Sequence, residues 1–118
     1  MQNLVSTLLG FTVQIHVFHW LTTSYSNHVA LGELYDGIHD LTDDFIEVYM
    51  GKRGRNIGTN TASMINYNAG SVNDTISTFE AFLIGLTNEL DPTDTDLLNI
   101  RDSMLDLVHK TQYLLTLG

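Results

Sequence analysis

Apolar residues recur every three or four positions along almost the whole chain, which is the spacing of amphipathic helices rather than strands. The single proline leaves this pattern nearly uninterrupted. The spacing predicts one all-α domain over residues 1–118, with helices at about 2–23, 28–50, 61–88 and 92–116. Helices of this number and length predict a four-helix bundle.

The first predicted helix is apolar on two faces. One face contains Leu4, Leu8, Thr12, Ile15, His19 and Thr22, and the other contains Leu9, Val13, Val17, Trp20 and Leu21. A helix that is apolar all round must be buried all round, and a single small bundle cannot cover both faces. We therefore expect a homo-oligomer in which the first helix lies in a subunit interface.

Helix ends are predicted from capping residues. Ser26-Asn27 is expected to cap the second helix, and Gly51 to end it in the left-handed conformation. Asp91 is expected to cap the fourth helix, with Pro92 in its first turn.

The chain is strongly acidic, with a formal net charge of −9, and it has no cysteine. The absence of cysteine excludes a disulfide framework and thiolate metal sites. The first 32 residues have no lysine or arginine, which argues against DNA binding through phosphate contacts. The N-terminus shows no basic leader, and no apolar run approaches the roughly 18 residues that a membrane span needs. We therefore expect a cytoplasmic protein without membrane contact.

Three of the five lysines and arginines lie together, as Lys52, Arg53 and Arg55. Two interpretations are open. In the first, these cations stabilise the C-terminus of the second helix through its dipole. In the second, the segment is an anion site, where the backbone at Gly51, Gly54 and Gly58 presents N–H groups and the cations hold a phosphate.

Aromatic residues extend the second interpretation to a nucleotide-type ligand. Tyr49 directly precedes the cations and is placed to stack on a base, and a neighbouring subunit could add Trp20, Tyr25 and His19. The spacing matches no Walker motif, so binding without hydrolysis is expected.

Two acid-x-x-His motifs, Asp36 to His39 and Asp106 to His109, have the spacing of metal-ligating residues in helical bundles. Both aspartates point away from the apolar stripes of their helices, so a metal at the bundle centre is not expected. His19 lies on the core stripe and is expected to be hydrogen-bonded.

His19-Trp20 and the segment ALGELYDG at 30–37 resemble the DNA-protecting mini-ferritins of starved bacteria. This resemblance implies iron ligands at His19, Asp36 and Glu47, shared across a dimer interface. The chain has Gly32 and Gly51 where that family has a further histidine and a glutamate.

The segments HVFHW, SYSNH and EVYMGKRGR resemble uncharacterised short ferritin-like proteins of phages and large DNA viruses. This resemblance implies a ferritin-like bundle acting in the cytoplasm of an infected cell.

The preferred hypothesis is a non-enzymatic protein that sequesters a small phosphorylated ligand, such as a nucleotide immune signal of the host. The alternative is a ferroxidase with iron held between subunits by His19, Asp36 and Glu47, assisted by His39. A third is a scaffold that binds another protein through its first helix.

Overall fold

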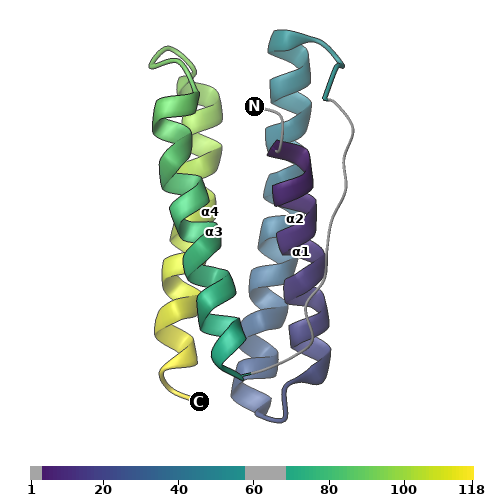
Figure 1. Cartoon of the computed structure of the whole chain (residues 1–118), viewed down its shortest axis with the longest axis vertical. Helices are drawn as coiled ribbons and strands as arrows, with labels where there is room; N and C mark the ends of the chain where they lie inside the picture. Colours follow the sequence, from purple (N-terminus) through teal and green to yellow (C-terminus); the bar gives the residue numbers. More distant parts are fainter. Residues whose placement is uncertain (1–3, 58–68) are drawn as a thin grey trace.

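A computed structural model describes residues 4–57 and 69–118. It contains helices α1 (Leu4–Leu21), α2 (Tyr25–Arg53), α3 (Ala69–Glu89) and α4 (Thr95–Leu115), and no strand within those ranges. They form a bundle with extents of 42 × 26 × 21 Å (Figure 1). The all-α four-helix prediction is therefore confirmed, whereas the homo-oligomer stays a prediction. The predicted start of the third helix at 61 falls in 58–68, outside the described residues.

The helices are arranged so that α2 packs against α1 and α4, while α3 packs against α4 and α1. α1 and α2 are antiparallel, as are α3 and α4, but α2 and α3 run in the same direction (Figure 1). The end of α2 and the start of α3 consequently lie at opposite ends of the bundle. Two consecutive helices that run in the same direction are also found in four-helix bundles of the ferritin type.

The core forms where the apolar stripes of the helices meet. Its most deeply buried members are Leu8, Ile15, Phe18, Leu31, Leu34, Ile38, Phe45, Ile76, Leu83, Leu97, Met104 and Val108. The rings of Phe11 and Phe79 stack with centroids 3.8 Å apart, which joins α1 to α3. The helical spacing of apolar residues thus identified the buried face of α2 and α4. In α1 the core also includes Phe11 and Phe18, which lie on neither of the two predicted faces.

Both ends of α2 differ from the prediction. The helix begins at Tyr25 because Ser24 caps it, its hydroxyl accepting the Asn27 N–H at 3.3 Å. At the other end Gly51 is still helical, and the left-handed residue is Gly54 (φ 86°), whose N–H donates to Met50 O at 2.7 Å. The predicted caps at Ser26-Asn27 and Gly51 are wrong because a second serine and a second glycine lie within three residues of them.

α4 begins three residues later than predicted. Asp91 to Asp94 form a turn, closed by the Asp94 N–H donating to Asp91 O at 2.8 Å. The Asp91 carboxylate accepts from the Thr93 N–H at 2.9 Å and from its hydroxyl at 2.8 Å. Pro92 is therefore in a turn before the helix, where its fixed φ is also favourable, and Asp94 is the N-cap position.

The expectation that no apolar run is long enough to span a membrane is wrong for α1. Among the described residues, this helix alone is long and apolar enough to cross a bilayer, judged by length and composition. In the bundle it buries Leu8, Ile15 and Phe18 against other helices, which is also how the core helix of a globular protein behaves.

Candidate functional site

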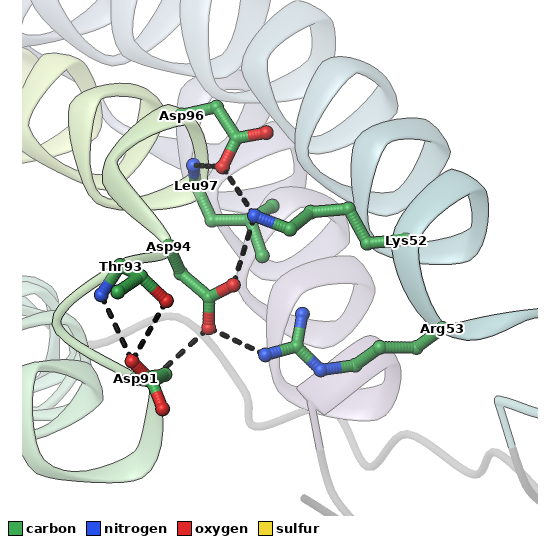
Figure 2. A network of polar contacts seen from close by, with 7 residues as sticks. All are labelled: Lys52, Arg53, Asp91, Thr93, Asp94, Asp96 and Leu97. Atoms are coloured by element: carbon green, nitrogen blue, oxygen red, sulfur yellow. Dashed lines mark hydrogen bonds and ion pairs between the residues drawn. The ribbon is translucent and has the colours of Figure 1, made fainter.

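The C-terminal end of α2 brings Tyr49, Lys52, Arg53 and Arg55 together, and we call these four residues the arginine end. Figure 2 shows Lys52 and Arg53 reaching across to the start of α4. Lys52 Nζ lies 2.9 Å from Asp94 Oδ1 and 2.7 Å from Asp96 Oδ1. Arg53 Nη2 donates to Asp94 Oδ2. One carboxylate therefore binds both cations, one through each oxygen.

Asp94 is the centre of this network. Its side chain is only 5% exposed, and Oδ2 also accepts the Asp91 N–H at 3.0 Å. Hydrogen bonds from Lys52 and Arg53 hold the pKa of the Asp94 carboxyl well below its usual range. In return, Asp94 and Asp96 raise the pKa of Lys52. A carboxylate buried this deeply needs such partners, because burial alone disfavours the charged form.

The other two members of the arginine end are arranged differently. The guanidinium carbon of Arg53 lies 5.1 Å from the centroid of the Tyr49 ring, within the range of a cation–π contact. Arg55 follows the left-handed Gly54 and is exposed, with no ion pair to any residue in 4–57 or 69–118. Among the described residues, the arginine end thus has one cation without an ion pair beside two that already bind carboxylates.

Trp20, Tyr25 and His19 lie far from the arginine end of the same chain. Tyr25 and Arg53 are the first and last residues of α2, a helix of 29 residues that is about 43 Å long. A single chain therefore does not bring the predicted aromatic residues to the predicted cations. A second copy would have to supply them, as the sequence-based hypothesis proposed.

The opposite end of α2 has a cluster of stacked rings, which we call the histidine end. His19 and His28 stack with centroids 3.8 Å apart. Nδ1 of His19 is 2.6 Å from His28 O, and Nδ1 of His28 is 2.7 Å from His19 O. Because a carbonyl only accepts, each Nδ1 is the donor, and in the neutral ring each Nε2 keeps its lone pair. His19 is hydrogen-bonded as predicted, but its partner His28 was not foreseen.

Further rings continue the histidine end along α1 and α2. His16 stacks on Tyr35 with centroids 3.8 Å apart and tilts against Trp20 at 4.0 Å. Gly32 lies beside the stack, where a Cβ would come within 2.8 Å of His19 Cε1. This close approach explains physically why glycine occupies the position at which the mini-ferritins have a histidine.

The predicted iron ligands do not form a site within one chain. Asp36 and Glu47 are both exposed on α2 and are eleven positions apart, or about 16 Å along the helix. The described contacts of His39 are with its neighbour Asp40, at 3.5 Å, and with the ring of Tyr35, whose centroid is 5.8 Å away. Within 4–57 and 69–118, no three histidine, aspartate or glutamate side chains are close enough to hold a metal together. The residues of one chain therefore do not fit an iron centre, and the inter-subunit site stays a prediction.

Arg101 is a buried polar residue that the sequence analysis missed. Nη1 donates to Leu83 O at 2.8 Å and to Thr87 Oγ1 at 2.9 Å, which ties α4 to α3. Its position between Leu97 and Met104, at core spacing, was the signal that this arginine faces inward. His109 makes a more exposed tie, with Nε2 2.7 Å from Glu80 Oε2.

Comparison with known proteins gives one match. A family model described as a family of unknown function (DUF5856) matches residues 19–115, which include His19, His28 and the arginine end. No curated protein and no solved structure matches the chain.

Proposed function

Because the chain belongs to DUF5856, a family of unknown function, its role has to be inferred from its own residues, and we propose that it binds a small phosphorylated, nucleotide-type ligand at the arginine end. The observation that supports this best is the arrangement of Arg53. Its guanidinium lies against the Tyr49 ring while Nη2 binds an oxyanion, the Asp94 carboxylate. Guanidinium groups bind phosphates with the same donors.

In this proposal Asp94 occupies the place that a phosphate would take. Lys52 and Arg53 each bind one of its oxygens, as they would bind two oxygens of a phosphate. The exposed Arg55 is the first contact for an incoming anion, and Tyr49 offers its ring to a base. Binding then requires the ligand to displace the Asp94 carboxylate from at least one cation.

Charge distribution favours this end of the bundle for an anion. Lys52 and Arg53 face Asp91, Asp94 and Asp96 (Figure 2), and Arg55 follows them directly in the chain, so these two short segments contribute three positive and three negative charges. The chain as a whole has a net charge of −9, so its remaining surface repels a phosphate. The arginine end is the region where a small anion meets the least repulsion.

The wider biological proposal rests on the viral resemblance. We propose that a homo-oligomer of this chain sequesters a nucleotide signal of the host in the cytoplasm of an infected cell. The shared direction of α2 and α3 supports the ferritin-like part of this proposal, because the second and third helices of ferritin-like bundles also run in the same direction (Figure 1).

Isothermal titration calorimetry with a panel of mono-, di- and cyclic nucleotides tests the proposal. The double variant Arg53→Ala with Arg55→Ala should lose binding while keeping its helical circular dichroism. Lys110→Ala is the matched control, since it removes an exposed cation from the C-terminal half of α4, away from Asp94 and Asp96. Normal binding by the double variant would show that the arginine end only fastens α2 to α4.

Asp94→Asn gives a sharper test. It keeps the shape of the side chain and removes the charge that competes with the ligand, so the affinity for a nucleotide should rise. If the same variant only lowers stability, and no nucleotide binds to it or to the wild-type protein, the anion-site proposal is wrong. Native mass spectrometry of the protein from infected cells would then show which other molecule, if any, it retains.

One observation favours a ferroxidase as a second candidate. His19 donates from Nδ1 to a backbone carbonyl, and this hydrogen bond is the one that orients many metal-ligating histidines for binding through Nε2. Asp36 and Glu47 would have to come from a neighbouring subunit. Aerobic oxidation of Fe(II) no faster than in buffer alone would end this candidate, and His19→Ala is the variant to compare if oxidation is faster.

A further inference from the structure

The outer face of α1 is an apolar surface that the bundle leaves uncovered. Leu9 is 48% exposed, Val13 47% and Trp20 62%, although the opposite side of the same helix is in the core. His16 lies between Val13 and Trp20 on this face and is half-buried, because its ring stacks on Tyr35. We call Leu9, Val13, His16 and Trp20 the outer seam. An exposed apolar surface of this kind on a helix usually binds another protein surface.

The charge of the chain indicates which surface that is. No aspartate, glutamate, lysine or arginine occurs before Glu33, so the outer seam has no formal charge, whereas the whole chain has a net charge of −9. Two copies repel each other through most of their surfaces. The uncharged seam is the face through which two such copies can meet without bringing acidic groups together.

The spacing of the outer seam is also that of a helix pairing with another helix. Its members are four, three and four residues apart, which is the repeat of a coiled-coil seam. Leu9 and Trp20 are equally far from its centre, and so are Val13 and His16. In an antiparallel pair related by a two-fold axis, Leu9 faces the partner's Trp20 and Val13 faces the partner's His16. A small side chain then meets a large one at every level, which allows close packing.

We propose that the outer seam packs antiparallel against the same seam of a second copy of this chain. The pairing covers Leu9, Val13 and Trp20 with their own counterparts and leaves the acidic residues of α2 in solvent. The same contact is made twice, once on each side of the two-fold axis, as expected for a symmetric dimer.

The dimer has a consequence for the arginine end, and this consequence rests on the function proposed above. α1 begins at the end of the bundle where α2 finishes (Figure 1). The partner's Trp20 lies at the level of Leu9 in the antiparallel pair, and the partner's Tyr25 lies beyond it towards Tyr49. Within one chain, Tyr25 and Arg53 are separated by the whole length of α2, about 43 Å. The partner therefore brings its own aromatic residues closer to the cations.

Cysteine cross-linking tests the pairing directly, because the natural chain has no cysteine. Leu9→Cys and Trp20→Cys are prepared separately, mixed and oxidised. The mixture should form a disulfide-linked dimer, whereas each variant alone should not. In the antiparallel pair, position 9 is about 16 Å along the axis from the partner's position 9, while a disulfide needs Cα atoms within about 7 Å. Ile84→Cys, at an exposed apolar residue of α3, is the control partner for Leu9→Cys and should not link to it.

Molar mass in solution provides the second measurement. Light scattering should give twice the chain mass for the wild-type protein, and Val13→Glu should halve this value because it places a charge in each half of the seam. Ile84→Glu adds the same charge at an exposed residue outside the seam and should leave the mass unchanged. A monomeric wild-type protein, or a Leu9→Cys variant that links efficiently to itself, overturns the proposal.

Flotation with neutral phospholipid vesicles separates this proposal from membrane binding, since α1 is long enough to span a bilayer. Flotation that Val13→Glu abolishes, together with a monomeric protein in solution, would assign the seam to lipid and overturn the dimer. None of the three measurements, cross-linking, light scattering and flotation, uses a nucleotide. Failure of the ligand proposal would therefore leave the dimer result unchanged, and a monomer that binds nucleotides would overturn the dimer alone.

Discussion

The histidine end and the arginine end hold the two ends of α2 by different means. At the histidine end, two stacked rings donate hydrogen bonds to backbone carbonyls of α1 and α2. At the arginine end, two cations share a buried carboxylate from the start of α4. The first arrangement joins helices that are adjacent in the chain, and the second joins helices far apart in it. Ring packing and charge pairing thus fasten the two ends of the same helix, and we expect the charge pairing to weaken in acid and in salt.

The largest expected effect is on packing at the histidine end. Gly32→Ala places a Cβ within 2.8 Å of the stacked His19 ring and should lower the free energy of unfolding by about 1–3 kcal/mol. Gly85→Ala is the matched control, because nothing lies within 4 Å of its added Cβ. That control should raise the free energy of unfolding by about 0.5–1 kcal/mol through helix propensity. Urea unfolding measures both, and equal shifts would show that the His19 ring is not held in place.

A smaller loss is expected when one ring of the pair is removed. His28→Ala deletes the hydrogen bond to His19 O and the stacking partner of His19, and should cost about 1–2 kcal/mol in the free energy of unfolding. The measurement is again urea unfolding. His39→Ala, at an exposed histidine of α2, is the control and should change stability little. Equal effects of the two substitutions would contradict a structural role for the stack.

The arginine end should respond to acid. The pKa of Asp94 is lower in the folded chain than in the unfolded chain, so its contribution to stability is complete above the ordinary carboxyl range and is lost as the pH falls below about 4. The melting temperature of the wild-type protein should therefore fall more steeply below pH 4 than that of Asp94→Asn. Parallel melting profiles for the two proteins between pH 5 and pH 2 would show that the carboxylate is not paired in solution.

The smallest effect is expected from the outer ion pair of the same network. Asp96 is 53% exposed, so its pairing with Lys52 is screened by solvent and salt. Asp96→Asn should lower the melting temperature less than Asp94→Asn does, and the difference from wild type should shrink further in 1 M NaCl. A larger loss from Asp96→Asn than from Asp94→Asn would reverse the order of importance that burial assigns to the two carboxylates.

Helices and core were predictable from sequence because their cause is local. An apolar residue every three or four positions defines a buried face whatever that face packs against, and Leu34, Ile38 and Phe45 are buried as this pattern predicted. Helix ends were less predictable, since Ser24 and Gly54 have the same capping chemistry as Ser26 and Gly51. Local chemistry identifies residues able to cap, and the packed structure selects among them.

The candidate site shows most clearly which features follow from the sequence and which require the tertiary structure. By itself, the sequence determined that three cations and Tyr49 share one stretch of chain, and that the first helix is apolar on both faces. Only the tertiary structure decided that Lys52 and Arg53 bind Asp94, and that Trp20 and Tyr25 lie at the other end of α2. The physical reason is that ion pairs depend on distance in space. Asp94 is 41 positions from Arg53 along the chain, and only the packing of α4 against α2 brings them into contact.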